Sequence, residues 1–119
     1  MDDIETIVRV CGALAVDTRV RILALLREGP RCVGALASRL EVSQSAVSQH
    51  LRILRDAGLV SADRQGYYIH YRLNEDALQA VAGSTRRLFL EKPDAPKSKR
   101  KGVTKPCATK NKSARNRKT

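Results

Sequence analysis

Short hydrogen-bonding side chains gather between residues 43 and 52 of this 119-residue chain, in the segment SQSAVSQHLR. Serine hydroxyls donate or accept hydrogen bonds, glutamine can bond an adenine edge through both amide atoms, and arginine binds guanine or phosphate. On a helix, one sector of about 100° holds Ser45, Ser48, Gln49 and Arg52. Because short side chains let a helix backbone approach closely, this face suits a helix whose N-terminal end enters the major groove of DNA.

The ends of the same segment add contacts of a different kind. Ser43 and Gln44 stand where the helix begins, and backbone amides at a helix start bind phosphate. Arginines near its end can hold phosphates as well. The alternative is an ordinary solvated polar face, and the elements that flank the segment decide between the two.

Those elements are predicted by apolar periodicity and by capping residues. The pattern predicts a first helix over 3–15, a second that Asp17 caps and Gly29-Pro30 ends, a third over 32–40, and a fourth that Ser43 caps and that runs to about Ala57. Two short helices joined by a three- or four-residue turn form a helix-turn-helix.

Apolar residues at helical spacing predict the inward faces of these helices. The second has Val20, Leu23, Ala24 and Leu26; the third has Val33, Leu36, Ala37 and Leu40; the fourth has Val47, Leu51, Leu54 and Ala57. The first helix has the apolar stripe Ile4, Ile7, Val8, Cys11, Leu14 and Ala15. The place of Cys11 on this stripe is typical of a buried small hydrophobe. His50 lies at the edge of the fourth helix's apolar side, which favours a packed histidine over a ligand.

Residues 60–73 change to a period of two, which predicts a two-stranded wing that turns at Gly66. In this alternation His70 lies on the strand face that is predicted to be exposed. Asn74 is expected to cap a last helix with the stripe Leu78, Val81, Ala82, Thr85, Leu88 and Phe89. The predicted fold is mainly α with a small β-hairpin, a winged helix-turn-helix of order α-α-α-α-β-β-α.

Charge divides the chain near Pro93. Residues 1–91 hold twelve arginines against eleven acidic residues, whereas residues 92–119 hold eight lysines and three arginines against Asp94 alone. We therefore expect a folded domain over 1–91 and a disordered, Lys-rich basic tail over 92–119 that binds DNA without reading sequence. No apolar run approaches the roughly 18 residues of a membrane span, and the acidic start is unlike a signal peptide, so a cytoplasmic protein is expected.

Three segments together resemble the ArsR/SmtB family of bacterial transcriptional repressors: LAVDTRVRILALL, LASRLEVSQSAVSQHLRILRDAGLV and RQGYYIHYRL. The resemblance covers about residues 8–90. It implies a homodimer joined through the first and last helices, which binds an imperfect palindrome in double-stranded DNA and leaves it when a small inorganic inducer binds. The wing tip, Arg64 and Gln65, would then lie along the flanking backbone or minor groove.

The resemblance also points to a sensor site, because many members of the family bind metals or metalloids. The family's Cys-x-Cys pair at the third helix corresponds here to Cys32, with Gly34 in place of the second cysteine. Cys11 of a partner subunit and Cys107 of the tail could add thiolates, a set suited to As(III) or another soft ion. Oxidation or persulfidation of Cys32 is the alternative signal. The family's zinc site on the last helix is not expected, because that helix has no histidine.

Two other classes of protein compete with an inducible repressor. A regulator of the same family that senses no metal would keep the DNA-binding residues and leave the cysteines structural. An architectural protein would use the basic tail with little sequence preference. An enzyme, the third class, is not expected, because the chain has no nucleotide-binding glycine motif, no zinc signature and no nucleophile with a base at useful spacing.

Overall fold

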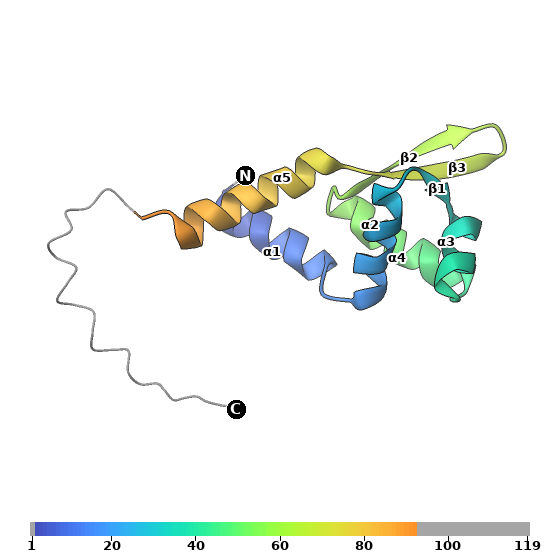
Figure 1. Cartoon of the computed structure of the whole chain (residues 1–119), viewed down its shortest axis with the longest axis horizontal. Coiled ribbons are helices and arrows are strands. Elements are labelled where there is room, and N and C mark those ends of the chain that lie inside the picture. The colour runs from blue at the N-terminus through green and yellow to red at the C-terminus, as the bar shows by residue number, and fades with distance from the viewer. Residues whose placement is uncertain (1, 93–119) are drawn as a thin grey trace, which may run out of the picture.

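The structure, a computed structural model, describes residues 2–92 of the chain. Its elements are α1 (Asp3–Ala13), α2 (Asp17–Arg27), β1 (Arg31–Cys32), α3 (Val33–Leu40), α4 (Gln44–Asp56), β2 (Val60–Gln65), β3 (Tyr68–Leu73), α5 (Glu75–Thr85) and the π-helical turn η1 (Arg86–Leu90). In Figure 1, α1 lies beside α5 at one end, and α2, α3, α4 and the sheet form the other. This arrangement confirms the predicted winged helix-turn-helix. Most of the predicted tail, from 93 onward, lies outside the described residues.

The wing is a three-stranded antiparallel sheet of order β1-β3-β2, and not the two-stranded hairpin that the sequence predicted. The additional strand consists of Arg31 and Cys32, which pair with Tyr71 and His70 of β3. Two residues show no periodicity, so only their pairing with a distant strand reveals them. Cys32 therefore precedes α3, whose first residue is Val33, and does not belong to the helix as predicted.

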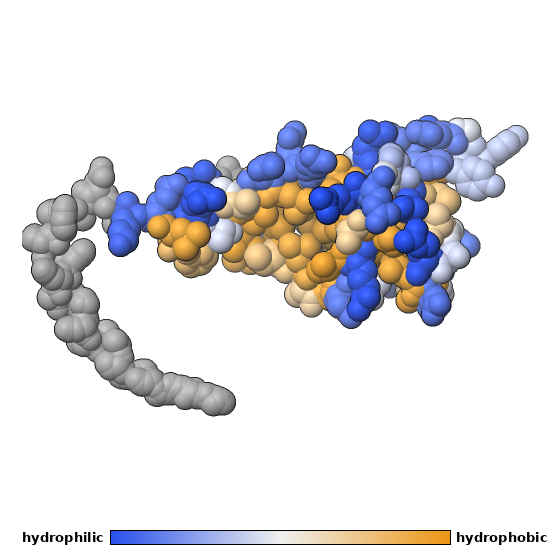
Figure 2. All heavy atoms as spheres, viewed as in Figure 1, coloured by the Kyte–Doolittle hydropathy of each residue, from blue (hydrophilic) through white to orange (hydrophobic). Residues whose placement is uncertain are grey.

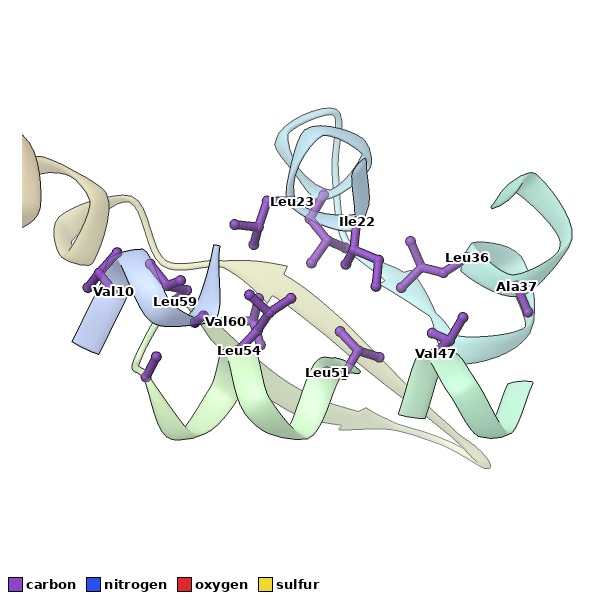
Figure 3. Close-up of a cluster of buried hydrophobic side chains, with 13 residues drawn as sticks. Val10, Ile22, Leu23, Leu36, Ala37, Val47, Leu51, Leu54, Leu59 and Val60 are labelled. Carbon is purple, nitrogen blue, oxygen red and sulfur yellow. The ribbon is translucent and has the colours of Figure 1, made fainter. Parts of the chain in front are cut away.

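The core fills the space where α2, α3, α4 and the sheet meet. Figure 3 shows Leu51 and Val47 of α4 pointing toward Ile22 of α2 and Leu36 of α3, and all four side chains are buried. The predicted inward faces of α3 and α4 are confirmed. That of α2 was wrong in part: its buried residues are Ile22, Leu23 and Leu26, whereas Val20 and Ala24 are exposed. The buried face is rotated because α2 packs against β3 as well as α3 and α4.

Two residues predicted to cap helices, Asp17 and Asn74, do not make the capping hydrogen bond. Asp17 is already inside α2, where its carboxylate lies 3.8 Å from the guanidinium of Arg21, and Val16 takes the N-cap position. Asn74 is the N-cap residue of α5, but its side-chain amide donates a 2.8 Å hydrogen bond to the carbonyl of Gly58. Asn74 thus joins the end of β3 to the turn after α4.

The end helices leave apolar residues uncovered. Helix α1 buries Val10 and Ala13 against the domain, while Ile4 and Val8 are 59% and 66% exposed. Phe89 in η1 is 66% exposed and Leu88 is 43% exposed, so the end of the predicted stripe of the last helix is not buried against α1. Figure 2 shows hydrophobic residues gathered over this end of the molecule, with hydrophilic residues among and above them. Within residues 2–92 no helix is long and apolar enough to cross a membrane.

Candidate nucleic-acid interface

Helix α4 is built to present one polar face. Ser43 is its N-cap residue, and the Ser43 hydroxyl accepts a 3.0 Å hydrogen bond from the backbone N–H of Ala46, as predicted. Buried side chains hold one side of the helix to the core. The opposite side is exposed at every position that the sequence assigned to DNA: Gln44, Ser45, Ser48, Gln49 and Arg52. The orientation of the helix is therefore as predicted, and the contacts with bases stay predictions.

The entry to α4 is set by the tight turn after α3. Glu41 adopts a left-handed conformation with φ of 58°, which is costly for a residue with a side chain, and ends α3 abruptly. The Gln44 side chain lies close to the start of α3. A Cβ placed at Gly34 would be 3.7 Å from the Nε2 atom of Gln44. This is an ordinary contact, so there is room for a Cβ at position 34, where the family has its second cysteine.

Arg19 of α2 connects α4 to α1 through hydrogen bonds. The Arg19 Nε donates a 3.3 Å hydrogen bond to Nδ1 of His50, and its Nη1 donates a 3.1 Å hydrogen bond to the carbonyl of Ala13. One side chain of α2 thus joins the end of α1 to the middle of α4. His50 is packed and hydrogen-bonded, as the sequence predicted.

The wing carries its predicted polar residues at its outer end. Arg64 and Gln65 are exposed and pair with Ile69 and Tyr68, and Gly66 supports the turn with φ of 65°. Sequence reasoning missed Tyr67, which is 97% exposed at the tip. Gly66 and Tyr67 form a two-residue loop between the paired residues Gln65 and Tyr68, and glycine at the first central position of such a loop would have placed Tyr67 in the turn.

Of the three candidate sensor cysteines, the structure describes two. Cys11 is exposed on α1 between Val8 and the end of the helix, so the expectation of a buried small hydrophobe there was wrong. Cys32 is a half-buried free thiol on β1. Cys107 lies outside the described residues. In the described part of the chain, no three His, Cys, Asp or Glu side chains group closely enough to hold a metal ion.

The sequence predicted that His70 lies on an exposed strand face, and this prediction was wrong. His70 is half-buried in the central strand, opposite Cys32 on one side and Asp63 on the other. Directly paired residues of an antiparallel sheet share a face, with Cβ atoms about 4.5–5.5 Å apart. The Nδ1 atom of His70 is fully buried and makes no hydrogen bond with the described residues. β1 therefore places a thiol and an imidazole side by side.

A polar cluster that sequence reasoning missed joins the two ends of the domain. Asp3 of α1 accepts 3.1 and 2.8 Å hydrogen bonds from Arg87 in η1 and a 2.8 Å hydrogen bond from the buried hydroxyl of Ser84. The hydrogen bonds from Arg87, and then that from Ser84, lower the pKa of Asp3 from 3.8 to about 2. The same contacts raise the pKa of Arg87. The cluster ties α1 to the π-helical turn.

A helix-turn-helix whose second helix exposes a hydrogen-bonding face, followed by a three-stranded wing, defines a winged helix DNA-binding protein. A family model described as "Bacterial regulatory protein, arsR family" matches residues 17–62. The transcriptional activator HlyU of Vibrio cholerae is 39% identical over 79 residues, which cover 66% of this chain and 73% of HlyU.

Two further relatives agree with this match. The HTH-type transcriptional repressor SmtB of Mycobacterium tuberculosis is 47% identical over 69 residues, 58% of this chain and 51% of SmtB. The homodimeric winged helix-turn-helix DNA-binding domain Mb0332 of Mycobacterium bovis matches with a TM-score of 0.60 at 32% identity, over 78% of this chain and 89% of that one.

The chain belongs to the ArsR family of bacterial regulatory proteins. It is a DNA-binding transcriptional regulator and not an enzyme, as the sequence indicated. HlyU is an activator and SmtB a repressor, so relatives of this chain regulate transcription in both directions.

Proposed function

We propose that the protein is a homodimeric repressor that binds an imperfect palindrome through α4 and leaves it in response to an inducer. The observation that carries this proposal is the exposed, uncharged polar face at the start of α4, held in place by the buried opposite face. The direction of regulation follows SmtB, a repressor 47% identical in the region it shares with this chain. As a DNA-binding regulator the protein would act in the bacterial cytoplasm.

In this proposal Ser45, Ser48, Gln49 and Arg52 read base edges, while Ser43, Gln44 and the wing-tip residues Arg64 and Gln65 contact the backbone. The test begins with an operator duplex recovered by selection from random DNA. Gln49→Ala should reduce preference for that duplex over random DNA by about 1–3 kcal/mol, without lowering the melting temperature. An unchanged preference would contradict the assignment of the face.

The dimer interface would be the apolar surface of α1 and η1. Ile4, Val8, Phe89 and Leu90 are 59–69% exposed in the single chain, whereas the core residues of the same domain are buried. Exposed apolar patches of this kind mark interaction sites, and a small domain gains buried surface by dimerising. The homodimeric state of Mb0332 supports the same assembly.

The inducer would act at Cys32, either as a thiolate-bound metalloid such as As(III) or as an oxidant of the thiol. Cys32 is half-buried beside His70, and β1 is hydrogen-bonded to β3, the central strand of the wing. A ligand on Cys32 would therefore strain the pairing that positions the wing on DNA. Cys11 and Cys107 are the other candidate ligands, in the second case from outside the described residues.

Cysteine variants separate these roles. Cys32→Ser should keep operator affinity and abolish release by arsenite, antimonite or a persulfide donor, measured by fluorescence anisotropy on the reduced dimer. Cys11→Ser and Cys107→Ser are matched controls, and loss of release in either would add that thiol to the site. If Cys32→Ser still releases DNA with the inducer, Cys32 is structural.

The division into a folded domain (1–91) and a basic tail (92–119) is part of the proposal. The tail's eight lysines and three arginines would add affinity for any DNA. Each phosphate that the tail neutralises adds roughly −0.9 to the slope of log K against log salt. Deleting residues 93–119 should weaken binding to operator and random DNA alike and flatten this slope; an unaltered slope would show that the tail contributes nothing.

A further inference from the structure

A groove runs between the outer part of α4 and the central strand of the wing. Its volume is 520 Å³, and it is lined by Ser48, Leu51, Arg52, Arg55, Asp56 and Tyr71. Leu51 is buried, and five of the six residues come from one side of α4. Tyr71 is half-buried, packs against the core and pairs with both Ala62 of β2 and Arg31 of β1. The walls are therefore the recognition helix and the most firmly held strand of the sheet.

The charge in this groove fits an anion. Its lining has two exposed guanidinium groups, Arg52 and Arg55, against the single carboxylate of Asp56. Ion pairs between residues 2 and 92 engage Arg21, Arg31, Arg72 and Arg87, and so leave both of these arginines available to an outside partner. The Ser48 and Tyr71 hydroxyls add neutral hydrogen-bond donors.

We propose that this groove holds a phosphodiester of the DNA backbone, bound by Arg55 and Tyr71. The inference rests on the proposed function, in which α4 enters the major groove and the wing lies over the flanking DNA. A sugar-phosphate strand separates the major groove from its neighbouring minor groove, so it must pass between a helix in the first and a wing beside the second. The groove between α4 and β3 is the place where it would pass.

The two ligands have different effects on DNA binding. Arg55 donates charge-assisted hydrogen bonds and neutralises a phosphate, which raises both affinity and its dependence on salt. Tyr71 donates a neutral hydrogen bond from a side chain that is fixed in the sheet, so it sets the distance of the wing from the backbone. Neither ligand reads a base, because phosphate contacts position a protein without carrying sequence information.

Anisotropy titrations of the full-length protein against the selected operator and a random duplex, over a range of salt concentrations, test the groove. Arg55→Gln should weaken both complexes by the same factor, about tenfold or more. It should also lower the salt slope by about 0.9 for each groove, or roughly 2 per dimer. Tyr71→Phe should weaken both complexes by about fivefold and leave the slope unchanged. The matched control is Arg27→Gln, which removes the same charge from an exposed position at the end of α2.

A second measurement locates the phosphate. Methylphosphonate groups, which are uncharged, replace single phosphates of the operator in turn. At one position per half-site the substitution should weaken binding of the unmodified protein and have no further effect on Arg55→Gln. If no position behaves in this way, or if Arg55→Gln binds like Arg27→Gln, the groove does not hold the backbone.

These outcomes are separable from a failure of the proposed function. If Gln49→Ala loses preference for the operator while Arg55→Gln behaves like Arg27→Gln, only the groove assignment is overturned. If Gln49→Ala keeps its preference, the reading face of α4 is wrong. The comparison of Arg55→Gln with Arg27→Gln on random DNA needs no operator, so it tests the groove even then. Circular dichroism melting of each variant checks that the fold is unchanged.

Discussion

Substitutions at Ser43 separate its role as the N-cap of α4, which the structure shows, from its proposed place against the DNA backbone. The Ser43 hydroxyl accepts the Ala46 N–H at 3.0 Å, and Ser43→Ala leaves that N–H to water. Loss of a serine N-cap costs about 1 kcal/mol. In a domain of this size, such a loss lowers the melting temperature by roughly 4–8 °C. Circular dichroism at fixed protein concentration measures the shift, because the stability of a dimer depends on concentration.

Asparagine and aspartate at the same position then isolate the charge. Both accept the Ala46 N–H, so Ser43→Asn and Ser43→Asp should melt near the temperature of the unmodified protein. Only aspartate brings a negative charge toward the DNA phosphates, so Ser43→Asp alone should bind operator more weakly, most clearly at low salt. An unaltered melting temperature in Ser43→Ala would refute the capping role. Equal DNA affinity of the asparagine and aspartate variants would refute the placement of this helix end against phosphates.

Two further predictions concern the end helices. Asp3 has its pKa lowered from 3.8 to about 2 by Arg87, so its contribution to stability is complete above pH 3.8 and is lost as the pH falls from 3.8 toward 2. Asp3→Asn should therefore flatten this part of the acid unfolding curve, followed by circular dichroism, and an unchanged curve would show that the cluster does not stabilise the fold. Val8→Asp would place two charges in the proposed dimer interface and should give a monomer with weaker operator binding in sedimentation and anisotropy experiments. Ala24→Asp, on the exposed side of α2, is its control and should stay dimeric; a dimeric Val8→Asp would contradict the interface.

Local patterns predicted helix α4 and its exposed polar face well. Val47, Leu51 and Leu54 recur at helical spacing within one helix, so their burial follows from the chain's own geometry. The cap at Ser43 and the turn at Gly66 are equally local, since each depends on residues within three positions. These features place the polar face of α4 outward before any tertiary contact is known.

Features that depend on distant segments were missed or misjudged. β1 has only two residues and exists because β3, some forty positions later, pairs with it. Nδ1 of His70, in the strand that pairs with β1, is buried, whereas strand alternation alone had placed this residue in solvent. Asp3 and Ser84 are separated by 81 positions, and no spacing rule relates them.

The sequence by itself determined the class of fold, the outward orientation of the polar face of α4, and the family. Periodicity, capping and motif order are properties of neighbouring residues, so they can be read before the chain is folded. Only the tertiary structure decided which candidate sensor thiol lies beside an imidazole and which apolar residues of α1 and η1 are exposed. It also decided where α4 and the wing form a groove whose arginines have no ion-pair partner among residues 2–92. These depend on how separate elements pack against one another. Packing is set by the sum of many weak contacts between distant segments, and no local pattern contains that sum.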